Sequence, residues 1–139
     1  MNAPDYFLGL DLGQAQDWSA LVIVKREHVR LDTGEAVEGQ RLAAFARDRF
    51  VRDELHIRHI VRYPLGTMYP EVVERVRALL ARPPLRGQSD LVVDATGVGR
   101  PVVDLFRKAN LHPIAVTITA GATPNQDGEN FRVPKRDLI

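Results

Sequence analysis

The stretch Asp90-Leu-Val-Val-Asp94-Ala-Thr-Gly-Val-Gly99-Arg-Pro101 decides the fold of this chain. It opens with an apolar run too short for a helix, which predicts a strand buried on both faces, as in a parallel sheet. A glycine-containing turn follows, and a helix is expected to begin at Pro101. Asp94 therefore lies at the carboxyl end of a strand, where open α/β sheets bind ligands. A carboxylate in that position is costly to desolvate unless a cation meets it.

The composition is that of a globular protein. The chain has 139 residues, of which 45% are hydrophobic and 27% charged, so a single domain with a sizeable core is expected over residues 1–139. Cysteine is absent, which excludes disulfides and thiolate metal sites. The sequence contains neither a signal peptide nor an apolar run of about 18 residues, and we expect a cytoplasmic protein.

Two strands are predicted before this stretch, over Phe7–Gly13 and Trp18–Lys25. The link between them is short, which predicts an antiparallel hairpin. Asp11 lies near the end of the first strand and Asp17 at the start of the second. The turn should therefore bring Asp11 and Asp17 to the same end of the sheet.

The remaining elements follow from periodicity and from proline and glycine positions. Residues 26–53 show no decisive pattern, and residues 119–130 are rich in Gly, Pro, Asn and Thr, which predicts a mobile loop. After that loop we expect a short extended piece and the first turn of a further helix, cut short at residue 139. The other predicted elements are a strand over 54–63, a helix over 70–82, a strand over 91–94, a helix over 101–109 and a strand over 113–118.

Together these elements predict an α/β fold with a five-stranded mixed sheet flanked by helices. Right-handed crossovers place the fourth strand beside the first and give the order 3-2-1-4-5. Strands 1–3 would be antiparallel, and strands 1, 4 and 5 parallel. Asp11 and Asp94 would then lie side by side.

This arrangement resembles the RNase H-like nuclease superfamily. Within it, the motifs resemble the C-terminal nuclease domain of the large terminase subunit of tailed phages, and the block from Asp94 to Pro101 is the most specific of them. The matching segments are Gly9-Leu-Asp-Leu-Gly13, Asp17-Trp-Ser-Ala-Leu21, Tyr63-Pro-Leu-Gly-Thr67, Val92-Val-Asp-Ala-Thr-Gly-Val-Gly-Arg-Pro101 and Val133-Pro-Lys-Arg-Asp-Leu138.

The resemblance implies a metal-dependent DNA endonuclease that cleaves concatemeric DNA during genome packaging. The family's first-strand and fourth-strand aspartates hold Mg²⁺ or Mn²⁺, and these fall on Asp11 and Asp94. An assisting acid at the start of the second strand falls on Asp17. Paired carboxylates suit this chemistry because these ions prefer hard oxygen ligands.

Two departures from the family pattern matter. The family's last metal-binding aspartate comes from a helix beyond the Pro-Lys-Arg-Asp-Leu motif, and this chain ends before it. The ATPase domain that precedes the nuclease is also missing, since no Gly-x-x-x-x-Gly-Lys-Ser/Thr motif occurs. A separated nuclease domain or a truncated prophage gene product is expected, weak or inactive by itself.

The resemblance also implies partners: double-stranded DNA, an ATPase domain or subunit, the portal and the small terminase subunit. Backbone amides at the start of the second helix and nearby cations could contact DNA phosphates. The candidate DNA-binding residues are Thr96, Gly97, Gly99, Arg100, Lys135 and Arg136.

Each acid also has an ordinary structural interpretation. Asp94 could cap the following helix, and Asp11 could cap a turn. Their expected placement on adjacent strands, with Asp17 at the same end, favours metal binding. His56 and His59 stand at odd spacing on a predicted strand, which points them to opposite faces and disfavours a ligand pair.

Three other functions remain open. The first hairpin also occurs in the actin-like ATPases and sugar kinases, although such proteins need two domains to close over ATP. The glycine-containing turn also resembles the cofactor turn of methyltransferases, but the next strand does not end in the acid that would hold a ribose. The third is a degenerate, non-catalytic RNase H-like domain that binds DNA, a portal or another packaging partner.

Overall fold

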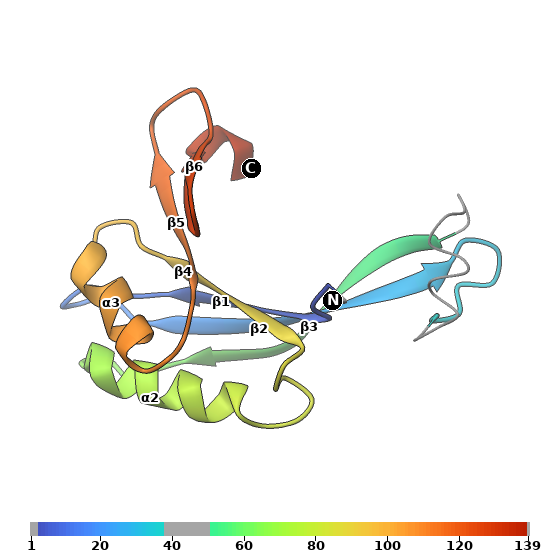
Figure 1. The fold of residues 1–139 in the computed structure, drawn as a ribbon, viewed down its shortest axis with the longest axis horizontal. Coiled ribbons are helices and arrows are strands. Elements are labelled where there is room, and N and C mark those ends of the chain that lie inside the picture. The colour runs from blue at the N-terminus through green and yellow to red at the C-terminus, as the bar shows by residue number, and fades with distance from the viewer. Residues whose placement is uncertain (1–2, 38–50, 139) are drawn as a thin grey trace.

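The computed structural model describes residues 3–37 and 51–138, which form an α/β fold with a mixed sheet (Figure 1). The described part contains seven strands, two α-helices and one short 3₁₀ helix. In chain order the elements are β1 (Tyr6–Asp11), β2 (Ala20–Arg30), β3 (Val51–Arg62), α2 (Tyr69–Leu80), β4 (Ser89–Asp94), α3 (Arg100–Lys108), β5 (Ile114–Thr119), β6 (Asn125–Asp127), β7 (Asn130–Pro134) and η1 (Lys135–Leu138).

The strands follow the order β3-β2-β1-β4-β5-β7-β6 across the sheet. β1 pairs antiparallel with β2, and β2 with β3, so the predicted N-terminal hairpin is confirmed. On its other side β1 pairs in parallel with β4, and the parallel pairing continues to β5 and β7. The α/β class is confirmed, whereas the predicted count of five strands is wrong because the chain after β5 adds two more.

Both α-helices pack against one face of the sheet. α2 directs Val72 and Val76 into the core, and α3 directs Phe106 there, each with none of its surface exposed. These side chains recur at helical spacing, and alternate residues of β1 and β4, such as Leu8 and Val93, meet them from the sheet.

The other face of the sheet is apolar and lies open. Its residues alternate with the core residues along each strand, so it carries Val22, Val92 and Val116, all half-buried. Near the edge of the sheet, Ile57 and Ile60 expose 66% and 65% of their surface. These two side chains have solvent rather than a helix above them.

β2 and β3 are longer than their neighbours, with 11 and 12 residues against six in β1, and their far ends form a two-stranded ribbon (Figure 1). The part of 26–53 that the structure describes therefore belongs mostly to this ribbon, while 38–50 lie outside the described residues. A bulge beside Ile23 shifts the register, so His56 pairs with Lys25 and His59 with Ile23. Those partners share a face, and the expectation that the two histidines point to opposite faces is wrong.

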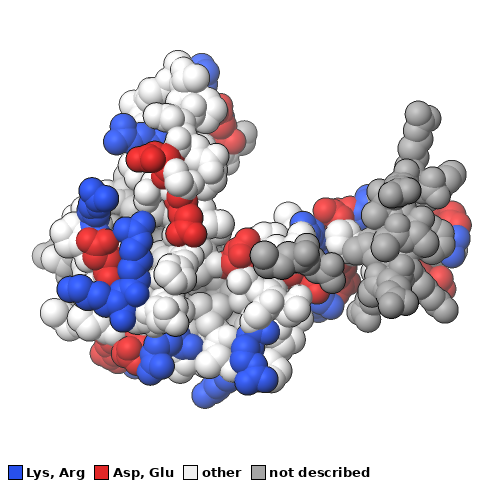
Figure 2. Space-filling view, in the orientation of Figure 1, with Lys and Arg blue, Asp and Glu red and all other residues white. Residues whose placement is uncertain are grey.

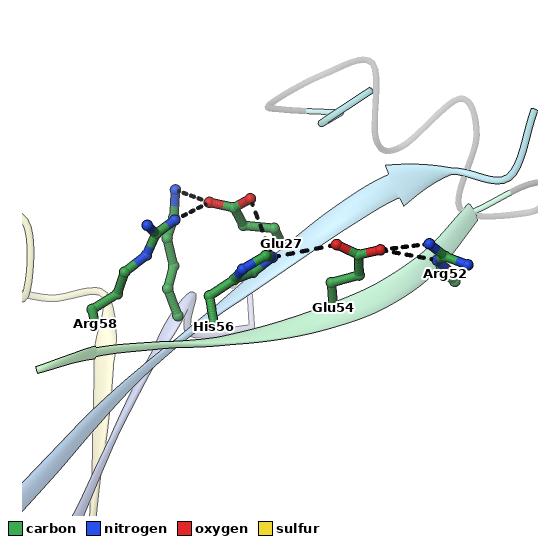
Figure 3. A network of polar contacts seen from close by, with 6 residues as sticks. Glu27, Arg52, Glu54, His56 and Arg58 are labelled. Carbon is green, nitrogen blue, oxygen red and sulfur yellow. Dashed lines mark hydrogen bonds and ion pairs between the residues drawn. The ribbon is translucent and has the colours of Figure 1, made fainter. Parts of the chain in front are cut away.

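Charged side chains run along this ribbon (Figure 3). Glu27 accepts from the Nη2 atom of Arg58 at 2.7 Å and pairs with Lys25 at 2.9 Å. The imidazole of His56 lies 3.6 Å from Glu27 and 3.4 Å from Glu54. This network therefore crosses between the two strands.

The predicted loop over 119–130 is partly wrong, since β6 and β7 form a hairpin there. The two-residue turn of the hairpin is Gly128-Glu129, and Gly128 has a φ of 59°, which a residue without a Cβ adopts readily. β7 then pairs in parallel with β5. The helical turn expected near Pro134 is present as the 3₁₀ helix η1. No helix in the described ranges is long and apolar enough to cross a membrane.

Candidate metal centre

Asp11 and Asp94 occupy the same register position on neighbouring parallel strands. Each is the last residue of its strand, so both carboxylates stand at the carboxyl end of the sheet. They line an open cavity of about 420 Å³ on the uncovered face of the sheet, together with apolar strand residues and Leu138 from η1. The structure thus brings together the two acids that the sequence predicted as neighbours.

Asp17 comes from the turn that joins β1 to β2. The amide of Asp17 donates to the carbonyl of Gln14 at 2.6 Å, and the amide of Gly13 donates to the hydroxyl of Ser19 at 3.1 Å. The hydroxyl of Tyr69 in α2 donates to the carbonyl of Gly13 at 2.9 Å. These bonds fold the turn back toward the end of β1.

Gly13 is required in this turn because a Cβ there would overlap the backbone carbonyl of Asp17. The close approach of the two backbone segments carries Asp17 toward Asp11. Glycine at this position therefore contributes to the placement of the third acid.

The negative charges of Asp94 and Asp17 act on Asp11 at this end of the sheet. Partial burial raises the pKa of Asp11, and the charges of Asp94 and then of Asp17 raise it further. In the described ranges, none of these three acids forms an ion pair with lysine, arginine or histidine. The three carboxylates together lack a compensating cation.

The N-cap of α3 is Gly99, without a side-chain cap hydrogen bond, so the predicted helix cap at Asp94 is wrong, and Asp94 instead stabilises the turn before the helix. One of its oxygens accepts from the amide of Thr96 at 2.8 Å and so stabilises the turn into α3. The hydroxyl of Thr96 accepts from the amide of Ile118 at 2.8 Å, which ties this turn to β5. The side chain of Gln14 donates to the carbonyl of Gly97 at 2.9 Å and joins the two loops. This hydrogen bond and metal binding are compatible, because a carboxylate has two oxygens.

The number of side chains that could hold a metal ion at this site is small. In residues 3–37 and 51–138, no three Asp, Glu, His or Cys side chains stand close enough to hold one metal ion. Asp11 and Asp94 therefore form a two-carboxylate site, with Asp17 within electrostatic range. Asp137 lies on η1, where its carboxylate is 3.6 Å from Arg136.

The six candidate DNA-binding residues fall into two groups. Four of them are exposed in the turn before α3 and at its first residue: Thr96, Gly97, Gly99 and Arg100. Lys135 and Arg136 are exposed on η1, and Arg136 donates to the carbonyl of Ala122 at 2.5 Å.

Sequence reasoning missed two further arginines, Arg107 and Arg132, which line a cavity together with Arg100. Arg132 was missed because the strand that carries it was expected to be only a short extended piece. No local motif marks either residue.

Comparisons with models of protein families, with curated proteins and with solved structures found no match for this chain. The fold and the acids at the ends of β1 and β4 are therefore the features of the chain that bear on its function.

Proposed function

We propose that this chain is a divalent-metal-dependent DNA endonuclease domain of the RNase H-like type, similar to the nuclease domain of a phage or prophage terminase large subunit. The supporting observation is the register of Asp11 with Asp94 on adjacent parallel strands. The substrate would be concatemeric double-stranded DNA during genome packaging. Portal, small terminase and an ATPase domain or subunit would be its partners.

The donor set suits Mg²⁺ or Mn²⁺. Both ions prefer carboxylate oxygens, and these acids form no ion pair with a lysine, arginine or histidine in the part of the chain that the structure describes. Asp11 and Asp94 would bind directly, while Asp17 would assist through water. Bound ions would supply the activated water and stabilise the leaving oxygen of the phosphodiester.

Two close carboxylates hold a divalent ion less firmly than three or four do. Since the described residues contain no third direct ligand, we expect weak ion binding and weak or undetectable cleavage by this chain alone. The proposal therefore needs a measurement of ion binding as well as one of cleavage.

Mn²⁺ titration followed by thermal denaturation measures ion binding. A ligand that binds only the folded state raises the melting temperature with concentration. We expect Asp11→Asn and Asp94→Asn each to abolish this rise. Asp90→Asn is the matched control, since Asp90 lies on the same strand as Asp94 but at its other end.

Plasmid nicking with Mn²⁺ or Mg²⁺ then tests cleavage. Weak nicking that disappears in both Asp→Asn variants would support the nuclease. Nicking by both variants at the wild-type rate would show a contaminating enzyme. A melting temperature of the wild type that does not respond to Mn²⁺ would contradict the metal site.

A non-catalytic domain is the second candidate, and the two-carboxylate set favours it. Such a domain would bind DNA or a packaging partner without any response to Mn²⁺. An actin-like ATPase or sugar kinase fragment is a weaker alternative, which a rise in melting temperature with ATP would support.

A further inference from the structure

A second cavity, of about 390 Å³, lies between α3 and the strands β5, β7 and β6. Strand register shows which side chains share its floor. Thr117 of β5 is the register partner of Arg132 in β7, and Arg132 is the partner of Asn125 in β6. Partners in adjacent strands project to the same face, so these three side chains form one row.

This groove and the candidate metal centre lie on opposite faces of the sheet. Asp94 is the register partner of Val116, whereas Thr117, the next residue, belongs to the groove. Ala95 and Gly99 of the turn before α3 line the groove, and Asp94 directly precedes Ala95. The turn from Asp94 to Gly99 therefore connects the acidic pair on one face to the groove on the other.

The groove is lined by three arginines from two elements. Arg100 and Arg107 are at the two ends of α3, and Arg132 faces them from β7. Figure 2 shows lysine and arginine side chains gathered over α3, beside the arm formed by the last strands. Arg107 pairs with Asp104 at 3.0 Å, while Arg100 and Arg132 form no ion pair with any described residue.

We propose that this groove binds the phosphodiester backbone of a DNA strand. Guanidinium groups present paired N–H donors that match phosphate oxygens, and two of the three here have no carboxylate partner among the residues that the structure describes. Asn125 adds an amide donor along the floor, and so does Asn130, whose amide nitrogen also donates to the carbonyl of Asp127 at 3.2 Å. The choice of DNA as the polyanion rests on the proposed function.

One acid in the groove opposes a phosphate. Asp127 is the register partner of Asn130 at the turn end of the hairpin and lines the same cavity. Its charge repels a phosphate in the groove, so neutralising it should strengthen binding. This gives the proposal a variant whose effect has the opposite sign to that of the arginine variants.

The test is fluorescence anisotropy with a labelled single-stranded oligonucleotide and with its duplex, in EDTA so that the metal centre plays no part. We expect Arg100→Gln and Arg132→Gln each to weaken binding of at least one of the two about fivefold to tenfold, with a salt slope smaller by about one. Asp127→Asn should strengthen binding of the same oligonucleotide. Arg86→Gln, an exposed arginine in the loop before β4, is the matched control and should change neither quantity.

Melting curves of each variant verify the fold, and the exposure of Arg100 and Arg132 predicts little change. Equal affinities for wild type and both arginine variants would overturn the proposal. Displacement of the DNA by inorganic phosphate at an equal concentration of phosphate groups would instead show a small-anion site and would also overturn it. The Mn²⁺ response of the wild type is measured separately, so failure of the groove and failure of the metal centre give different results.

Discussion

Asp11 and Asp94 are held beside each other by the backbone of the sheet, because they are register partners in two strands that are both interior to it. β1 is paired on both sides, with β2 and β4, and β4 is paired with β1 and β5. The folded state therefore keeps two like charges close without help from a side-chain partner. We expect the repulsion between these charges to lower the free energy of unfolding of the metal-free protein.

Asp11→Asn should stabilise the metal-free protein at pH 7. The pKa of Asp11 is raised above its ordinary value of 3.8, so its contribution to stability is most favourable below that value and is lost as pH rises through the folded-state pKa. Since Asp11 is mostly exposed and only partly desolvated, the gain at pH 7 should be only about 1–2 °C in melting temperature. Melting curves at pH 7 and pH 3 check this, and a gain of equal size at both would contradict the electrostatic cause.

Glu27→Gln should show the opposite dependence. The hydrogen bond from Lys25 lowers the pKa of Glu27 below its ordinary value of 4.5, with smaller contributions from Arg58 and His56. Its stabilising contribution is present above 4.5 and is lost as pH falls through the lowered pKa.

The variant should therefore melt below the wild type at pH 7 and together with it in strong acid. Glu129→Gln, in the exposed turn between β6 and β7, is the control and should match the wild type at both values. A deficit for Glu27→Gln that persists in acid would indicate lost packing rather than lost charge.

Gly13→Ala should destabilise the protein by about 1–3 kcal/mol, the usual cost of overpacking. The added methyl group would overlap the backbone of Asp17, which cannot move without opening the turn. Urea denaturation measures the loss of unfolding free energy. Gly121→Ala is the control, because its Cβ would meet the hydroxyl of Thr119 at an ordinary 3.5 Å.

The part of the fold nearest the acids followed directly from sequence. The apolar run before Asp94 predicted a buried strand, and the handedness of crossovers placed that strand beside β1. Asp11 and Asp94 could be identified as neighbours because both end their strands, and strand ends coincide in a parallel pair.

The hairpin after β5 was missed although a signal for it existed. Glycine at the first position of a two-residue turn, as at Gly128, is typical of tight hairpins, but the flanking residues, such as Asn125, are polar and lack the alternation of a half-buried strand. Every residue of β6 is exposed, so no hydrophobic pattern was required there. The groove arginines then followed from pairing between strands, which local sequence does not encode.

Ile57→Thr combined with Ile60→Thr should reduce self-association of the protein with little effect on its stability. Both side chains are about two-thirds exposed at the sheet edge, and threonine keeps the β-branched shape that strands favour. We expect a change in unfolding free energy within about 0.5 kcal/mol per site. Light scattering over a concentration series measures the association.

Val61→Thr provides the matched contrast on the same strand. Val61 packs against the core, so its replacement should cost about 1–2 kcal/mol and leave association unchanged. Equal stability losses in the double variant and in Val61→Thr would show that the isoleucines are covered in solution.

The pairing of β1 with β4 also fixes the spacing of the backbone positions at which the two strands end. The distance between the Cα atoms of residues 11 and 94 is set by main-chain hydrogen bonds, which do not depend on the chemical identity of the two residues. Histidine at both positions would present imidazole nitrogens, which suit zinc or copper, on the same pair of Cα atoms. The Cα spacing would thus be kept, whereas the hydrogen bond from the Thr96 amide to Asp94 would be lost.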